Sequence, residues 1–280
     1  MIHIAYATKK QHYIPQMILK QHYVDFENIQ IPEKYPYLWQ YDKANKVERK
    51  IYDVSKICYE KNLYEFKDDS GQIIPGTCND LENYLSKCES KWNVALKRII
   101  DCRYQIEKVS VDDWALMFTL MASQIMRTPE AIKHNTKYIQ NTVKDSSENA
   151  SEQYAKYISL VFEGIDNEKS WMVSHLLKLL FTKNIILGHT DEIFLLNGNR
   201  PVLIFSTANM TVNDASLYFP FNKHYCILMK PSYEHEKNRT VTANYHEFPD
   251  TFVQILNQHN FENEGRFIYA GRKISTLIEC

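Results

Sequence analysis

The sequence is short of glycine and holds none of the glycine-rich motifs that bind phosphate groups. It has seven glycines in 280 residues, and neither G-x-x-x-x-G-K-[ST] nor G-x-G-x-x-G occurs. The G-x-S-x-G nucleophile turn and the protein kinase motifs are also absent. Because these motifs build the commonest nucleotide-binding and hydrolase sites, most familiar enzyme classes are disfavoured.

Cysteine pairs and long apolar runs are missing as well. The six cysteines form no C-x-x-C pair, which is typical of reduced thiols in a cytosol. No stretch approaches the roughly 18 consecutive apolar residues of a membrane span. The N-terminus lacks the basic and apolar segments of a signal peptide. We therefore expect a cytoplasmic protein that does not enter a membrane.

The charge is nearly balanced, with 33 basic and 34 acidic residues and a net charge of -1. No global field draws the chain to nucleic acid or to an anionic membrane, although a local basic groove is compatible with this balance. Tyrosine is abundant, with 19 copies, and 44% of the residues are hydrophobic. This composition favours well-packed elements over disorder.

The hydrophobic periodicity predicts an α+β fold built as one domain, residues 1–280, in three successive regions. The first region, residues 9–70, is expected to hold a short helix over 15–23, a β-hairpin and a short strand. The hairpin and the strand are assigned to residues 35–42, 47–54 and 62–66.

The other two regions differ in their period. Residues 77–184 follow a helical period and predict a central bundle, in which one helix begins near Asn79 and Ser110 caps a second that ends at Pro129. Further helices fit 130–144, 149–164 and 168–184. Residues 185–280 return to strands and predict an antiparallel or mixed sheet with one helix. Its strands are expected at 193–196, 202–206, 225–229 and 266–270, with a loop over 233–246 and the helix over 249–260.

A polar run from Gln11 to Gln16 stands just before the first helix, where free N–H groups attract anions. His12 in this run could act as a general base or hold a phosphate or carboxylate, with Gln11 and Gln16 binding the substrate. The alternative is that His12 and Gln11 hydrogen-bond the backbone in a buried turn.

Two further sets of polar residues lie on the predicted helices. Gln124 and Arg127 are three residues apart and face one side of a helix end, where Arg127 could clamp an anion or satisfy terminal carbonyls. Glu82 and Glu89 are seven residues apart on the first long helix. They could bind a divalent metal, divide acid and base roles, or lie solvated on the surface. No third metal ligand is evident in the sequence.

These polar residues fall within longer motifs. The motifs are Lys9 to Gln16, Leu38 to Lys43, Asp53 to Ile57, Leu81-Glu82, Glu89 and Gln124 to Pro129. In order and spacing they resemble a largely uncharacterised bacterial family, the domain of unknown function numbered 4238. The family has no established activity. The resemblance implies that one pocket, or one buried polar network, is formed by Gln11, His12, Glu82, Gln124, Arg127 and Asn209.

The C-terminal part of the match departs from the family at one motif. Where the family has Ser-Asp-Asn-Pro at a strand end, the run Ser206 to Met210 keeps Asn209 but has Ala208 in place of the acid. Asn257 and the run Gly265 to Tyr269 resemble the closing asparagine and strand of the family. Loss of the carboxylate weakens the case for catalysis.

Two functional hypotheses follow. The first is a hydrolase, such as a nuclease, or an effector of a bacterial defence or toxin type that acts on a phosphate-bearing substrate or nucleic acid. It would use His12 as base, Arg127 as anion clamp and Glu82 as an orienting residue or ligand, with a substrate contacted by Gln11, Gln16, Gln124, Asn209 and Asn257. The alternative is a non-catalytic ligand- or protein-binding module on the same pocket. A third possibility is purely structural, with every one of these polar residues satisfied within the protein. Substrate, metal requirement and oligomeric state do not follow from the sequence.

Overall fold

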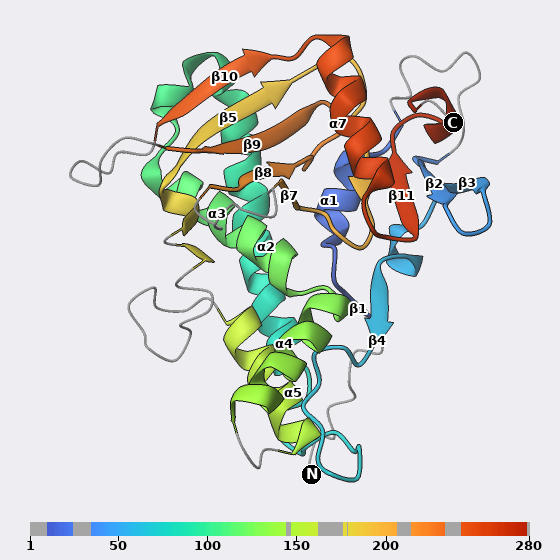
Figure 1. Cartoon of the computed structure of the whole chain (residues 1–280), viewed down its shortest axis with the longest axis vertical. Coiled ribbons are helices and arrows are strands. Elements are labelled where there is room, and N and C mark those ends of the chain that lie inside the picture. The colour runs from blue at the N-terminus through green and yellow to red at the C-terminus, as the bar shows by residue number, and fades with distance from the viewer. Residues whose placement is uncertain are drawn as a thin grey trace.

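In Figure 1 the two larger sheets lie in the upper half of the protein, and helices α4 and α5 form its lower end. The predicted α+β class is confirmed, with strands near the N-terminus, helices in the middle of the chain and a C-terminal sheet that carries a helix. The computed structural model describes residues 10–24, 35–143, 147–161, 176–177, 179–205, 214–232 and 242–278.

A five-stranded mixed sheet forms the upper part of the molecule in Figure 1. Its strand order is β10 (Ala243–Glu247), β5 (Lys183–His189), β9 (Tyr225–Pro231), β8 (Ser216–Phe219) and β7 (Leu203–Phe205). Only the β10–β5 pair is parallel among these strands. The loop predicted over 233–246 is therefore wrong in its last residues, because the polar residues of β10 form an edge strand that leaves them exposed to solvent.

A second sheet joins the two ends of the chain. Its order is β3 (Val47–Ile51), β2 (Leu38–Asp42), β11 (Phe267–Ala270) and β6 (Leu196–Asn197). The predicted hairpin is confirmed as β2 and β3, with antiparallel pairing from Leu38 opposite Ile51 to Asp42 opposite Val47. The predicted last strand, β11, pairs with β2, although the two strands lie near opposite ends of the sequence.

The third sheet is a ribbon of only two strands, β1 (Lys10–His12) and β4 (Tyr59–Lys61). The strand predicted over 62–66 is wrong, because the chain turns at Asn62, which has a φ of 55°. After this turn Leu63, Tyr64 and Glu65 send buried side chains into the core without strand pairing. An apolar run with one acid does not distinguish these two arrangements.

Five helices and two 3-10 turns are described between β1 and β5, and α3 and α4 among them follow each other directly. The helices are α1 (Gln16–Gln21), α2 (Asp80–Asp101), α3 (Val111–Met126), α4 (Pro129–Thr142) and α5 (Glu148–Leu160), with 3-10 turns η2 (Val54–Lys56) and η3 (Arg103–Lys108). The Ser110 hydroxyl accepts a hydrogen bond from the Asp113 N–H at 3.0 Å, which is the predicted cap of α3. Thr128 caps α4 at the residue after Arg127, the C-cap of α3. No helix in the described part of the chain could span a membrane.

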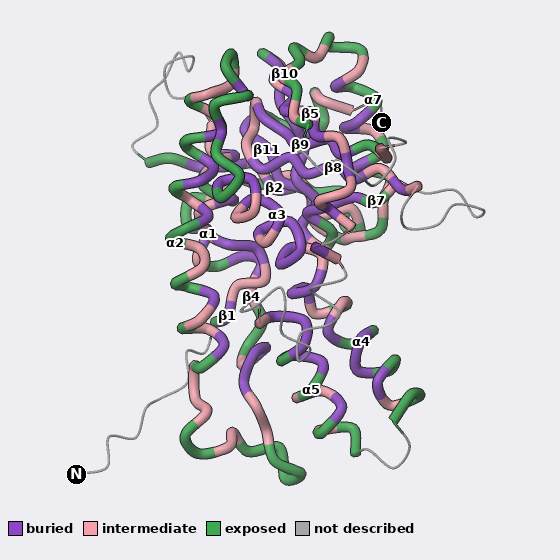
Figure 2. The backbone as a smooth tube through the Cα atoms, turned by 90° about the vertical axis from the view of Figure 1, so that its left-hand side faces the viewer, coloured by how far each residue is buried: buried purple, intermediate pink, exposed green. Residues whose placement is uncertain are grey.

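The core is centred on α3, which is buried on nearly every side. Trp114, Phe118 and Met121 of α3 pack in one hydrophobic cluster with Trp92 of α2 and Leu187 of β5. In Figure 2 the buried segments gather where α3 passes under the strands, whereas α4 and α5 are buried on one face only. A helix enclosed in this way is expected to be apolar all round. Each buried polar residue of α3 therefore needs a structural or functional explanation.

Helix α7 (Asp250–Glu262) is fastened to the strands by asparagine side chains. The Asn257 amide donates to the Ile193 carbonyl at 2.8 Å and accepts from the Leu195 N–H at 2.9 Å. Asn260 donates to the Leu195 carbonyl at 2.5 Å. The chain before β6 therefore completes its backbone hydrogen bonds with side chains of α7 instead of a neighbouring strand.

We expect Asn257→Ala to destabilise the protein by about 2 kcal/mol, because it leaves the Leu195 N–H and the Ile193 carbonyl buried without partners. Urea unfolding measures the change. Gln254→Ala on the exposed side of the same helix is the matched control and should change stability by less than about 0.5 kcal/mol. Equal effects of the two variants would contradict the fastening role of Asn257.

Candidate functional site

The candidate site begins at the ribbon of β1 and β4, where side chains alternate between two faces. Gln11 points into the core and is fully buried. Lys10 and His12 project from the other face, together with their cross-strand partners Lys61 and Tyr59. The His12 ring lies 5.8 Å from the Tyr59 ring, measured between centroids.

Gln11 is held in a buried network. Its amide nitrogen donates to Glu65 Oε1 at 2.5 Å, and its amide oxygen accepts from the Tyr64 N–H at 2.6 Å. Glu65 Oε2 in turn accepts from the Asn79 N–H at 3.1 Å, just before α2 begins. Both ends of the Gln11 amide are thus satisfied by protein groups, so this side chain locks β1 onto the start of α2.

Arg127 lies beside this network at the junction of α3 and α4, with only 1% of its surface exposed. Its Nε donates to the Tyr64 hydroxyl at 3.1 Å, and Nη1 donates to Glu89 Oε1 at 3.0 Å. Nη2 donates to the His12 backbone carbonyl. The guanidinium therefore ties β1, Tyr64 and α2 to the end of α3, and each of its nitrogens is already bonded to a protein acceptor.

Glu82 lies two turns before Glu89 on α2 and is partly buried. Burial raises the pKa of its carboxyl to about 7, the positive charge of Arg127 opposes this rise, and the negative charges of Glu89 and Glu65 add to it. Its Oε2 is enclosed and makes no hydrogen bond within the described residues. Glu82 is therefore partly protonated at neutral pH, and its Oε2 has no hydrogen-bond partner among the described residues.

The imidazole of His12 complements this carboxyl. Burial lowers its pKa, and a hydrogen bond with the Ser55 backbone partly opposes the shift. Within the described residues Nε2 is enclosed without a partner, so the Ser55 bond falls to Nδ1. A proton held on Nδ1 leaves the lone pair of Nε2 free at neutral pH. The arrangement can accept a proton at His12 and supply one from Glu82.

Arg127 lies beside both His12 and Glu82, because it donates to the His12 backbone carbonyl and its charge acts on the Glu82 carboxyl, and Gln11 belongs to the adjoining network. The other predicted residues that the structure describes have different surroundings. Gln124 lines a different pocket, and Asn257 fastens α7. Gln16 is the first residue of α1 and is partly buried. Asn209 and Ala208 lie outside the described residues, as does most of the helix predicted over 168–184.

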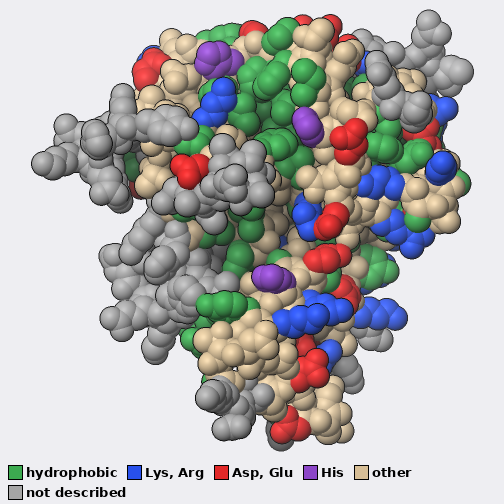
Figure 3. All heavy atoms as spheres, in the orientation of Figure 1, with side chains coloured by type: hydrophobic (Ala, Val, Ile, Leu, Met, Phe, Trp, Pro, Cys, Tyr) green, Lys and Arg blue, Asp and Glu red, His purple; other side chains and the backbone are tan. Residues whose placement is uncertain are grey.

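The reasoning from sequence missed Tyr64 and Glu65, which organise the site. The available signal is a single acid inside the run Leu63 to Phe66, because a carboxylate enclosed by apolar residues requires partners. A metal site is not evident: the described ranges hold no group of three His, Cys, Asp or Glu side chains placed to bind an ion. On the face in Figure 3, Lys and Arg side chains are interspersed with Asp and Glu side chains.

Glu82→Gln should make the stability of the protein less dependent on pH. The carboxyl has a pKa of about 7 in the native state and an ordinary value of 4.5, so its ionisation increasingly penalises the native state as the pH rises from 4.5 through 7. We expect the variant to match the wild type near pH 4.5 and to exceed it by about 2 kcal/mol at pH 8, as measured by urea unfolding. Glu107→Gln at an exposed position is the control. A difference that does not vary with pH would contradict the assignment.

Comparison with known proteins agrees with the motifs. A family model described as "Protein of unknown function (DUF4238)" matches residues 10–273. Searches of curated proteins and of solved structures find no match. The matched span includes β1, α2 and the junction of α3 with α4, which together build the candidate site. The chain belongs to the DUF4238 family.

Proposed function

We propose that the protein is a hydrolase that cleaves a phosphodiester, with His12 as general base and Glu82 as general acid. One observation carries the proposal. In a cluster whose other members are hydrogen-bonded, His12 Nε2 and Glu82 Oε2 are each enclosed without a partner among the described residues. Leaving a buried polar atom unpaired costs stability, and such atoms are found where a substrate or water is to be bound.

The protonation states suit proton transfer at neutral pH. Burial lowers the pKa of His12, so its imidazole is neutral and able to accept a proton. The pKa of Glu82 is raised to about 7, so a large fraction of the carboxyl retains a proton to donate. Two groups with opposite protonation requirements are what general acid–base hydrolysis needs.

The choice of a phosphodiester as substrate is supported by two lysines on the same face of the ribbon as His12. Lys10 stands directly opposite Lys61, next to the pair of His12 and Tyr59. Like charges in direct cross-strand pairs repel each other, and a bound anion relieves the repulsion. Lys10 Nζ lies 4.8 Å from the centroid of the Tyr59 ring. An aromatic ring beside lysines is a surface that single-stranded nucleic acid uses, so this is the substrate that we propose.

Arg127 takes a positioning role in this proposal and does not clamp the anion. Its three nitrogens already donate to Tyr64, Glu89 and the His12 carbonyl. Removing it would leave these acceptors without their donor. Its contribution is to hold the backbone of His12 against α2, which carries Glu82.

The reaction then follows directly. His12 Nε2 takes a proton from water, and the water oxygen attacks the phosphorus. The bond from phosphorus to the leaving oxygen breaks, and the Glu82 carboxyl gives its proton to that oxygen. The phosphate oxygens that gain negative charge lie against Lys10 and Lys61.

The test is cleavage of labelled single-stranded RNA and DNA by the full chain, followed on gels. His12→Gln and Glu82→Gln should each slow cleavage by about a hundredfold or more, with the fold kept intact as judged by circular dichroism. The exposed His246→Gln is the control and should cleave at the wild-type rate. Wild-type kcat/KM should fall above about pH 7 as Glu82 loses its proton, and Glu82→Gln should remove this fall.

Other outcomes decide against the enzyme. If the wild type binds the oligonucleotides without cleaving them, and His12→Gln and Glu82→Gln lose this binding, the cluster belongs to a non-catalytic binding module. If neither binding nor cleavage occurs with any of these oligonucleotides, the phosphodiester proposal is wrong.

A further inference from the structure

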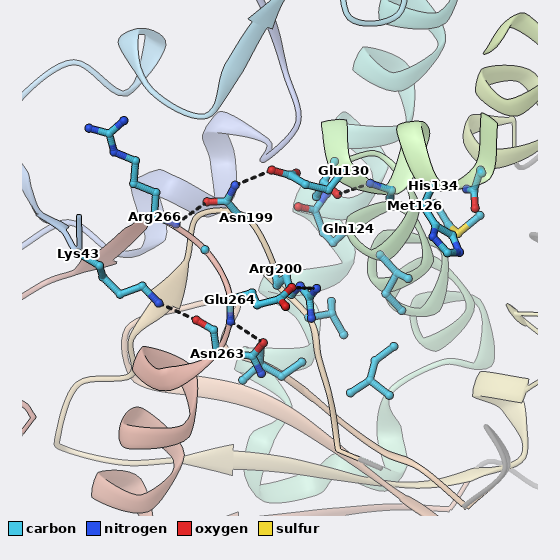
Figure 4. Close-up of a pocket in the computed structure, with 18 of the residues that line it drawn as sticks. Lys43, Gln124, Met126, Glu130, His134, Asn199, Arg200, Asn263, Glu264 and Arg266 are labelled. Atoms are coloured by element: carbon cyan, nitrogen blue, oxygen red, sulfur yellow. Dashed lines mark hydrogen bonds and ion pairs between the residues drawn. The ribbon is translucent and has the colours of Figure 1, made fainter. Parts of the chain in front are cut away.

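A second cavity, of about 1070 Å³, lies between the junction of α3 with α4 and the loops that flank β6 and β11. Figure 4 shows Gln124 and Glu130 on its helical side, with Asn199 facing them and bonded to Glu130. His12, Glu82 and Arg127 are not among the residues that line it. Its volume is near the upper end of the usual range for small-molecule sites.

Gln124 is the unusual residue of this cavity. It is 1% exposed, and neither its amide nitrogen nor its amide oxygen has a hydrogen-bond partner among the described residues. It sits on α3, the most enclosed of the described helices. A carboxamide buried in this way is costly, because a donor and an acceptor both lose water without compensation. A ligand that offers one acceptor and one donor side by side would satisfy both atoms.

Three basic side chains that line the cavity already have partners within the protein. Arg266 binds Asp42 at 2.8 Å, and Arg200 binds Glu264. Lys43 donates to the carbonyls of Phe261 and Asn263 at 2.8 and 2.6 Å, at the end of α7. Carboxylates offset the charges of the two arginines, and backbone carbonyls occupy the ammonium group of Lys43. The cavity is therefore suited to an uncharged ligand.

Part of the remaining wall is apolar. Met126, Val202 and Leu203 are buried and line the cavity beside Gln124. Apolar side chains next to the Gln124 amide suit a flat ring that carries its hydrogen-bonding groups on one edge. A glutamine amide pairs in this way with the adjacent acceptor and donor on the edge of a nucleobase.

We propose that this cavity binds an uncharged nucleoside or nucleobase, with the Gln124 amide reading the donor and acceptor on the edge of the base. The site does not depend on the activity of His12 and Glu82. Removing the Gln124 amide should abolish recognition without harming the empty protein, because the group that is removed has no partner in the fold.

The test is calorimetric titration of the full-length wild type with adenosine, guanosine, cytidine and uridine. At least one nucleoside should bind with a dissociation constant below about 1 mM. Gln124→Leu should weaken that binding about tenfold or more, while its thermal midpoint without ligand is equal to or higher than that of the wild type. Ser123→Ala is the matched control. Like the Gln124 amide, the Ser123 hydroxyl is buried on α3 without a described partner, but Ser123 does not line the cavity. This variant should leave the affinity unchanged.

Three results would overturn the proposal. The first is no saturable binding of any of the four nucleosides. The second is unchanged affinity in Gln124→Leu. The third is binding of the 5′-monophosphates alone, which would mean that the cavity recognises a charge and that the pairing of Arg200 and Arg266 does not exclude anions.

Discussion

The buried guanidinium of Arg127 is the interaction on which the arrangement of the site depends. It joins the His12 carbonyl, the Tyr64 hydroxyl and the Glu89 carboxylate at the point where α3 ends and α4 begins. Burial of one charge without full compensation costs several kcal/mol, so the three acceptors must be held in place together. Because they come from β1, the segment after β4, and α2, one side chain sets the positions of parts of the chain that are remote in sequence.

The buried polar side chains are of two kinds: those whose hydrogen-bonding atoms all have protein partners, and those with an enclosed atom that has none among the described residues. Gln11, Glu65, Asn257 and Arg127 have their hydrogen-bonding groups matched by protein partners, and they specify how elements dock. His12, Glu82 and Gln124 keep enclosed atoms without described partners. A protein gains no stability from the second kind, and this is the physical reason for proposing ligands at the cluster and at the cavity.

Chemical reasoning from residue type reached part of the candidate site. His12, Glu82 and Arg127 are grouped by their motifs, and Arg127 contacts the His12 backbone carbonyl and acts on the charge of Glu82. Their roles were harder to foresee, because a side chain can bind a ligand only if other protein groups do not already bind it. Arg127 has the charge and geometry to bind an anion, but its guanidinium already donates hydrogen bonds to Tyr64 and Glu89. The three-residue spacing of Gln124 and Arg127 predicts one helix face, but α3 is packed on nearly every side, so the two residues meet different neighbours.

Local sequence determined the elements with strong periodicity or clear caps: the hairpin of β2 and β3, helices α2 and α3 with the Ser110 cap, helix α7 and strand β11. These depend on interactions between residues close in the chain, which composition and spacing record. Only the tertiary structure decided that β11 joins β2, that β10 lies parallel to β5, and that Tyr64 and Glu65 enter the core. Each of these depends on which distant group completes a hydrogen bond or covers an apolar surface. The polar run from Gln11 to Gln16 illustrates both. Its pattern marked the place where the chain enters α1, and only distant residues made Gln11 a structural anchor and enclosed His12 Nε2 without a described partner.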